Sequence, residues 1–266
     1  MNDYVRKTAI QELAKGWKDD PDTLLILKKQ AQNDENKGVR SAAIQELTKG
    51  WSDTPNILPI LRDRVKNDEH EDVRSAAVQG IATGWKDNPN TLPILHDRAQ
   101  NDEHEDVRKT SVQEMAKGWR NNPNTLFILK LQAQNDKSEN VRKTAIQEIF
   151  RGWKKDLDIL SWLKDRAQND ESEDIRKTVL QKLARNWKND PDILPWLKDR
   201  AQNDESENVG KTAVQELARG WKDDPNTLPW LKDRAQNNDN DNDLCRATVQ
   251  EIATGWKDDP DTILLL

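Results

Sequence analysis

The stretch GWKDDPDTLLIL, residues 16–27, returns with small changes along the whole chain. Its tryptophan recurs every 34 residues through seven copies and after 35 residues in the eighth. The copies are Trp17, Trp51, Trp85, Trp119, Trp153, Trp187, Trp221 and Trp256. Such a period is typical of a solenoid, in which each unit buries its apolar face against its neighbours. The sequence predicts one repeat array over residues 1–266, with an incomplete repeat at each end.

The composition is polar, with 34% hydrophobic residues, 34% charged residues and a formal net charge of -6. This balance alone would allow disorder, but 11 tryptophans, most of them at regular intervals, favour a packed structure. No apolar run reaches the roughly 18 residues that a membrane span needs. The single cysteine excludes an internal disulfide and fits a reducing compartment. We expect a cytoplasmic chain without a cofactor.

Each unit is predicted to contain two helices. The helix before the tryptophan, residues 5–15 in the first unit, has its apolar residues on one face and is termed the B helix. The helix after it, residues 23–33, is termed the A helix. We expect Asp72 and its equivalents to cap the B helices and Asp22 and its equivalents to cap the A helices. The residue before the repeat tryptophan, glycine in seven copies and Asn186 in the eighth, is expected to end the B helix at positive φ.

An aspartate followed six residues later by an arginine recurs in consecutive units. The pairs are Asp34 and Arg40, Asp68 and Arg74, Asp102 and Arg108, Asp136 and Arg142, and Asp170 and Arg176. This pattern resembles HEAT repeats, in which such an Asp and Arg form a ladder between units. The period also suits tetratricopeptide repeats, but those carry a tyrosine downstream of the tryptophan, and this chain has only Tyr4.

The chain is most similar to the short HEAT-like units of phycobilin-lyase-type proteins. Its GWKDDPDTL variety also resembles arrays attached to cyanobacterial NACHT-type signalling ATPases. The resemblance implies an all-α, right-handed α-solenoid of about seven and a half two-helix HEAT-like repeats, with the B helices lining the concave face.

The arginine column is interpreted as structural, with anion binding as the alternative. An unpaired guanidinium at the edge of a buried face would be costly, whereas a paired one orients its neighbours. Gly210 and Cys245 replace the arginine in the last two B helices. The C-terminal units are therefore expected to be less stable.

No motif indicates catalysis, so the chain is predicted not to be an enzyme, a chromophore lyase included. His70 and His104 stand beside carboxylates but lack a ligand set with zinc spacing, which favours solvated loop histidines and no metal site. The run DNDND at residues 239–243 lacks the glycine of a calcium loop and is interpreted as a longer polar loop. Cys245 has no neighbouring base.

Three polar columns follow the outer face of the B helices. The middle column is glutamine in all eight copies, and each flanking column is basic in six of eight. Solenoids commonly bind partners on the concave side, and a glutamine row can both donate to and accept from an extended backbone. The alternative is that these three columns are only the solvated face of the helices and bind nothing. The candidate binding residues are Gln79, Gln113, Gln147, Gln181, Gly80, Lys109, Lys143, Arg151, Lys177 and Arg185.

Gly80 interrupts a predicted helix, where it costs about 1 kcal/mol relative to alanine. Two interpretations of this glycine are open. It reflects neutral sequence drift, or it leaves a shallow, uncharged dip in the groove around Gln79. Three further tryptophans, Trp162, Trp196 and Trp230, replace isoleucine on consecutive A helices. They are interpreted as core filler or, if exposed, as a stripe that binds a partner.

The sequence predicts a scaffold or sensor module that binds a protein or peptide, as part of a larger signalling protein. The alternative is nucleic-acid binding along the basic columns. Interleaved glutamates, the net negative charge and the scarcity of tyrosine and phenylalanine count against that alternative. Because neither end carries a polar capping unit, we also expect either a piece of a longer protein or end-to-end self-association.

Overall fold

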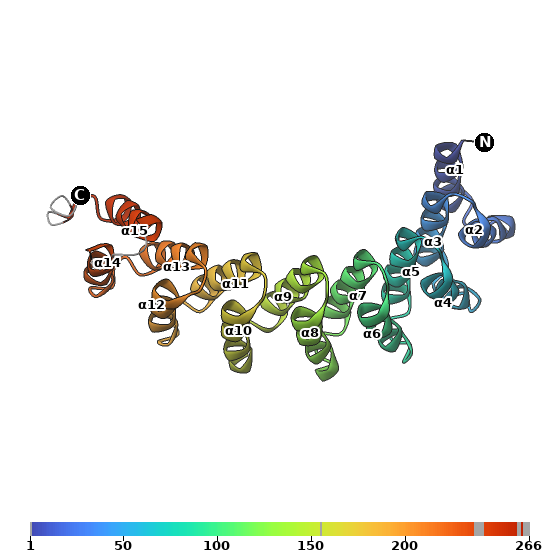
Figure 1. Cartoon of the computed structure of the whole chain (residues 1–266). Helices are drawn as coiled ribbons and strands as arrows, with labels where there is room; N and C mark the ends of the chain where they lie inside the picture. The colour runs from blue at the N-terminus through green and yellow to red at the C-terminus, as the bar shows by residue number, and fades with distance from the viewer. Residues whose placement is uncertain (1, 155, 237–241, 260–261, 263–266) are drawn as a thin grey trace. The chain divides into compact units, whose positions relative to one another are not determined.

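The computed structural model describes residues 2–154, 156–236, 242–259 and 262. In these residues the chain forms fifteen α-helices and no strand (Figure 1). The B helices are α1 (Asp3–Gly16), α3 (Lys37–Trp51), α5 (Glu71–Gly84), α7 (Glu105–Gly118), α9 (Glu139–Trp153), α11 (Glu173–Asn186), α13 (Glu207–Gly220) and α15 (Asn242–Gly255). The A helices are α2 (Pro21–Asn33), α4 (Ile57–Asn67), α6 (Thr91–Asn101), α8 (Pro123–Asn135), α10 (Leu157–Asn169), α12 (Ile193–Asn203) and α14 (Thr227–Gln236).

The chain divides into two compact units, Met1–Gly152 (unit 1) and Trp153–Leu266 (unit 2). In unit 1, α2 packs on α3, α4 on α5 and α6 on α7, while α1, α3, α5 and α7 pack side by side. Unit 2 repeats this arrangement, since α10 packs on α11, α12 on α13 and α14 on α15, and the B helices again lie side by side. The prediction of an all-α solenoid of about seven repeats is confirmed.

Within each unit, the core lies between the A and B layers and continues from repeat to repeat. In unit 1, Leu61 of α4 and Ile44, Leu47 and Ile81 of the B helices are fully buried. Leu197 of α12 and Leu217 of α13 hold comparable places in unit 2. These side chains come from positions spaced three or four residues apart, which form one face of a helix.

The predicted caps are wrong by two residues for α2, α8 and α10. The helices α4, α6 and α12 do begin after the predicted Asn56, Asn90 and Asp192, but these side chains make no capping hydrogen bond. Asp20, rather than Asp22, caps α2, and its carboxylate accepts a hydrogen bond of 2.9 Å from the backbone N–H of Asp22. Asn122 caps α8 in the same way. The residue two places earlier is the cap because its side chain precedes the first turn and can accept a hydrogen bond from the backbone N–H two residues later. The equivalent Asp261 lies outside the described residues.

The ends of the B helices also differ from the prediction. No residue of the described chain has positive φ. The helix α1 includes Gly16 as its last residue, and Trp17 is the C-cap with φ -130°. The Trp17 N–H continues the helical pattern by donating to the Leu13 carbonyl, so the chain needs no left-handed residue there. At the other end, Ser172 caps α11 by accepting from the Ile175 N–H, whereas the predicted cap, Asp174, lies inside the first turn.

Gly80 is buried in unit 1, so the prediction of a dip in the binding face is wrong. A Cβ atom at this position would lie 2.6 Å from Thr48 Oγ1 and 2.9 Å from Leu61 Cδ2. The glycine therefore lets α5 approach the neighbouring repeat closely. The space that its missing side chain leaves is filled by Thr48 and Leu61.

Candidate functional site

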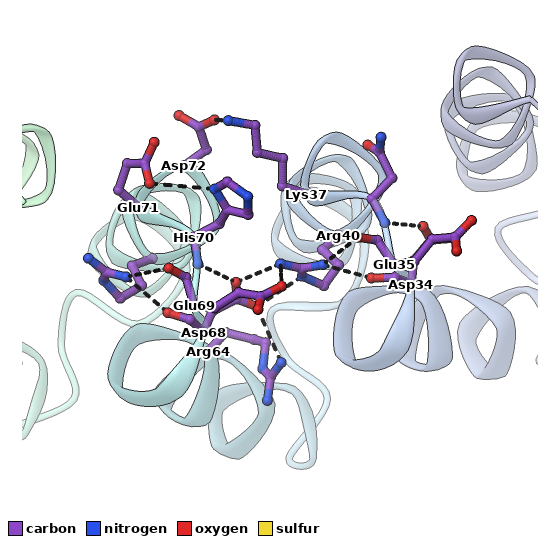
Figure 2. Close-up of polar contacts among 12 residues, drawn as sticks. Asp34, Glu35, Lys37, Arg40, Arg64, Asp68, Glu69, His70, Glu71 and Asp72 are labelled. Atoms are coloured by element: carbon purple, nitrogen blue, oxygen red, sulfur yellow. Dashed lines mark hydrogen bonds and ion pairs between the residues drawn. The ribbon is translucent and has the colours of Figure 1, made fainter.

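In unit 1, Arg40, Arg74 and Arg108 of the B helices each join two successive loops. Arg40 donates from Nε and Nη2 to the two carboxylate oxygens of Asp68, at 3.0 and 2.8 Å. Its Nη1 donates to the backbone carbonyl of Asp34 at 2.8 Å. Figure 2 shows this guanidinium between the loop before its own helix and the loop of the next repeat. Both Arg40 and Asp68 are buried, and their bidentate geometry is the strong form of an ion pair.

The same contacts recur at Arg74 with Asp102 and at Arg108 with Asp136. The aspartate six residues before each arginine thus contributes its carbonyl, and the carboxylate comes from the aspartate 28 residues after it. Hydrogen bonds from Arg74 to Asp102 and from Arg108 to Asp136 raise the pKa of both guanidinium groups. Arg142 extends the series by donating to the Asp136 carbonyl. These residues connect repeats rather than face a ligand.

The flanking basic columns are largely neutralised by the chain's own carboxylates. Lys109 lies 2.9 Å from Asp106 and Lys177 lies 2.9 Å from Asp174, in the first turns of their own helices. Lys143 pairs with Glu139. The hydrogen bond to Asp174 raises the pKa of Lys177. These cations are held by local acids, and the basic columns therefore attract anions less than their composition indicated.

The second basic column is paired with a column of partly buried glutamates. Arg151 lies 2.6 Å from Glu148 in unit 1, and Arg185 of unit 2 binds Glu216 of the next repeat. Burial raises the pKa of Glu114, which also lies near Glu148. The sequence pattern alone predicts that these glutamates are exposed surface charges. Their burial was missed because helical position alone does not show how closely the next B helix packs.

The glutamine column remains solvent-exposed between the two paired columns. Gln79, Gln113 and Gln147 of unit 1 are exposed, and Gln181 of unit 2 is half-buried. Within the described part of the chain, no hydrogen bond engages these four amide side chains. Each amide therefore keeps its donors and its acceptor available to a partner. Gly80 is the one candidate that the structure removes from this face.

Two of the histidines lie beside acidic residues of their own helices, and the three extra tryptophans are neither fully buried nor fully exposed. His70 Nδ1 lies 3.5 Å from Glu71, and His104 Nδ1 accepts from the Asp106 N–H at 3.3 Å, as a helix cap. Among the described residues, no group of three potential ligands could hold a metal ion. Trp162, Trp196 and Trp230 are half-buried, and Lys198 lies over the Trp230 ring at 5.6 Å. Part of DNDND lies outside the described residues.

Three segments match the model of HEAT repeats, residues 1–82, 59–149 and 160–253. The chain belongs to the HEAT repeat family. These matches leave few residues uncovered, and the layered A and B helices agree with them.

Two solved structures share this fold. The Escherichia coli protein YibA is 19% identical over 95% of this chain and 92% of its own, with a TM-score of 0.54. A mutant of Kap121p is 16% identical over 99% of this chain and 33% of its own, also with a TM-score of 0.54. At such identities the likeness extends to the fold alone. Curated proteins give no significant match. None of the described helices has the length and apolar character to cross a membrane.

Proposed function

We propose that this chain is a non-enzymatic protein-interaction scaffold that binds a protein or peptide through the polar face of its B helices, which we place on the concave side of the array. The observation that supports this most is the exposed glutamine column, whose amides make no hydrogen bond in the described residues. A row of free amides at one-repeat intervals suits an extended chain, because each amide can pair with a backbone N–H and a carbonyl.

Nucleic-acid binding is the less favoured reading. Backbone recognition of nucleic acid requires cations that exchange counterions for phosphates. Here Lys109, Lys143 and Arg151 already hold carboxylates, and separating those pairs would offset the gain. Salt titration distinguishes the two readings. Affinity for a protein partner should change little between about 50 and 300 mM salt. Affinity for a nucleic acid should fall steeply over the same range, because salt weakens phosphate contacts.

The decisive experiment uses the full chain as bait and compares two triple variants. Replacing Gln79, Gln113 and Gln147 with alanine should weaken capture of the partner identified with the wild type by at least tenfold, about 1.4 kcal/mol. The matched control replaces Gln134, Gln168 and Gln202, exposed glutamines of the A helices, and should bind as the wild type does. Equal binding by both variants would move the site away from the B helices.

A role within a larger signalling protein, as the likeness to NACHT-associated arrays implies, belongs to the same proposal, and so does self-association. Tyr4 and Val5 of α1 are 77% and 46% exposed, and Trp17, which follows α1, is 58% exposed. Val39, the equivalent of Val5, is fully buried. These exposed apolar side chains support self-association through α1. Light scattering over a concentration series should show a rising mass, and Trp17→Lys should suppress the rise.

A further inference from the structure

A pocket of about 550 Å³ lies in unit 1 where α6 and α8 end. Gln100, Asn101 and Glu103 line one side, and Leu131, Gln132 and Asn135 line the other. Two smaller pockets occupy equivalent places in the preceding repeats, with volumes of about 340 and 300 Å³. The repeats are alike in backbone and sequence, so the difference must come from side chains.

The two smaller pockets contain an arginine of the chain itself. Arg64 donates from Nη1 to the carbonyl of Gln32 in the preceding A helix, at 3.1 Å, and to Asp68 at 3.3 Å. Figure 2 shows Arg64 directed at Asp68, on the side opposite His70. Arg98 lies 3.5 Å from Asp102 in the same manner. Each ladder aspartate here carries two guanidinium groups, one from the B helix and one from the A helix.

The larger pocket lacks its arginine. Gln132 stands where the preceding repeats have Arg64 and Arg98, and Leu131 stands where they have aspartate. Asp136 is buried and is held by Arg108 and by the Ser138 N–H, but no second arginine reaches it in the described residues. Gln100 takes the place of Gln32 beside the pocket. Two of the acceptors that bind Arg64, the carbonyl of Gln32 and the carboxylate of Asp68, are therefore repeated here at Gln100 and Asp136 without a guanidinium. The third acceptor, Asp63, is replaced by Leu131.

The charges of the pocket also favour a cation. Asp102, Glu103 and Asp136 line it together with Arg108 and Lys137, which leaves one more acid than base. Arg108 directs Nε and Nη2 to Asp136, and its Nη1 to the carbonyls of Asp102 and Glu103. Its guanidinium is thus occupied and offers little to an anion.

We propose that this pocket binds the guanidinium group of an arginine side chain from a protein partner, in the place that Arg64 and Arg98 fill in their repeats. A planar fork of donors can contact a carboxylate and a carbonyl together, which the compact ammonium of lysine does less well. The site is separate from the B-helix face and does not rest on the glutamine column.

The probe is Nα-acetyl-arginine-N-methylamide, followed by NMR on the full chain with its asparagine and glutamine side-chain amides labelled. Saturable shifts should appear at Gln100, Asn101 and Asn135. Gln132→Arg should weaken binding at least tenfold, because the new arginine occupies the pocket. The blocked lysine analogue should bind at least threefold more weakly. Circular dichroism and the remaining amide signals report whether each variant keeps its fold.

A second variant tests the proposal by gain of binding. Arg98→Gln should open an equivalent pocket beside Asp102, so that the shifts reach Asn67 and Asn101 and a second equivalent of probe binds. The proposal is overturned if Gln132→Arg binds the probe as the wild type does, if the wild type shows no saturable shift, or if inorganic phosphate shifts the same amides.

Discussion

Arg108 of unit 1 and Arg176 of unit 2 occupy equivalent positions but make different contacts. Arg108 holds the Asp136 carboxylate with two hydrogen bonds of 2.8 Å. Arg176 donates only to the carbonyls of Asp170 and Glu171, and no hydrogen bond or ion pair in the described residues joins it to Asp204, 28 residues on. An identical motif thus gives a link between repeats in one unit and a link within a loop in the other. The repeats share a sequence pattern without sharing the strength of their connections.

Removing the two arginines should produce the largest difference. Arg108→Leu leaves the buried Asp136 without any cation, which costs about 3–5 kcal/mol. Arg176→Leu removes bonds to carbonyls from a half-buried side chain and should cost about 1–2 kcal/mol. Urea unfolding followed by circular dichroism measures both. Arg74→Leu should fall between them, because Asp102 keeps its contact with Arg98. Equal losses for all three would contradict the comparison.

Two glycines should respond to alanine with opposite signs. Gly80→Ala brings a Cβ to 2.6 Å from Thr48 and should destabilise unit 1 by about 1–3 kcal/mol. At Gly210 of unit 2 the nearest atoms to a Cβ lie at 3.5 Å, which is ordinary contact. Gly210→Ala should stabilise by about 0.5–1 kcal/mol through helix propensity. Thermal unfolding of the two variants gives the signs, and Gly220→Ala, at a helix end with open space, serves as the control.

Hydrogen exchange should show the same gradient in the wild type. Amides of α13 and α15 should exchange about tenfold faster than those of α5 and α7, since opening is easiest where repeats are least connected. Gly210 and Cys245 provide no ladder arginine in those two helices. Protection that is uniform from Trp17 to Trp256 would show that the ladder does not set local stability.

Acid should produce the smallest effects. Hydrogen bonds from Ser138 and Asn140 lower the pKa of Glu105, and Ser206 and Asn208 do the same for Glu173 in unit 2. A lowered carboxyl pKa stabilises the fold above pH 4.5, the usual value of the group, and this contribution is lost as the pH falls below it. Glu105→Gln and Glu173→Gln should therefore both lower the unfolding midpoint at pH 7 and converge with the wild type once the pH falls below the lowered carboxyl pKa.

Glu114 should behave in the opposite way. Burial raises its pKa above 4.5, so the folded chain binds this proton more tightly than the unfolded chain, and stability falls as the pH rises above that value. Glu114→Gln should raise the unfolding midpoint at pH 7 and match the wild type in acid. A lower midpoint at pH 7 would mean that the contact with Lys117 outweighs burial.

The sequence predicted the period, the two helices per repeat and the family, because tryptophan spacing and apolar periodicity are properties of the chain itself. It placed the caps two residues late at Asp22, since several polar residues in DDPD can cap a helix and only the backbone path selects Asp20. Pairing of Arg40 with Asp68 depends on how repeats stack. Gln132 was visible, together with Gln30, as a glutamine in a column that is otherwise arginine. A substitution shows a pocket only once the neighbouring acceptors are located.

The close contact between Thr48 and Gly80 means that neighbouring repeats are not interchangeable. One unit before Glu114 and Glu216, the residue equivalent to Thr48 is an alanine, Ala82 or Ala184. Excising the 34 residues 69–102 would keep the period but set Glu114 in the place of Gly80, against Thr48. Repeat genes ordinarily lengthen and shorten by unequal recombination between neighbouring repeats. Such an event would therefore be tolerated at some junctions and would destabilise the fold at this one.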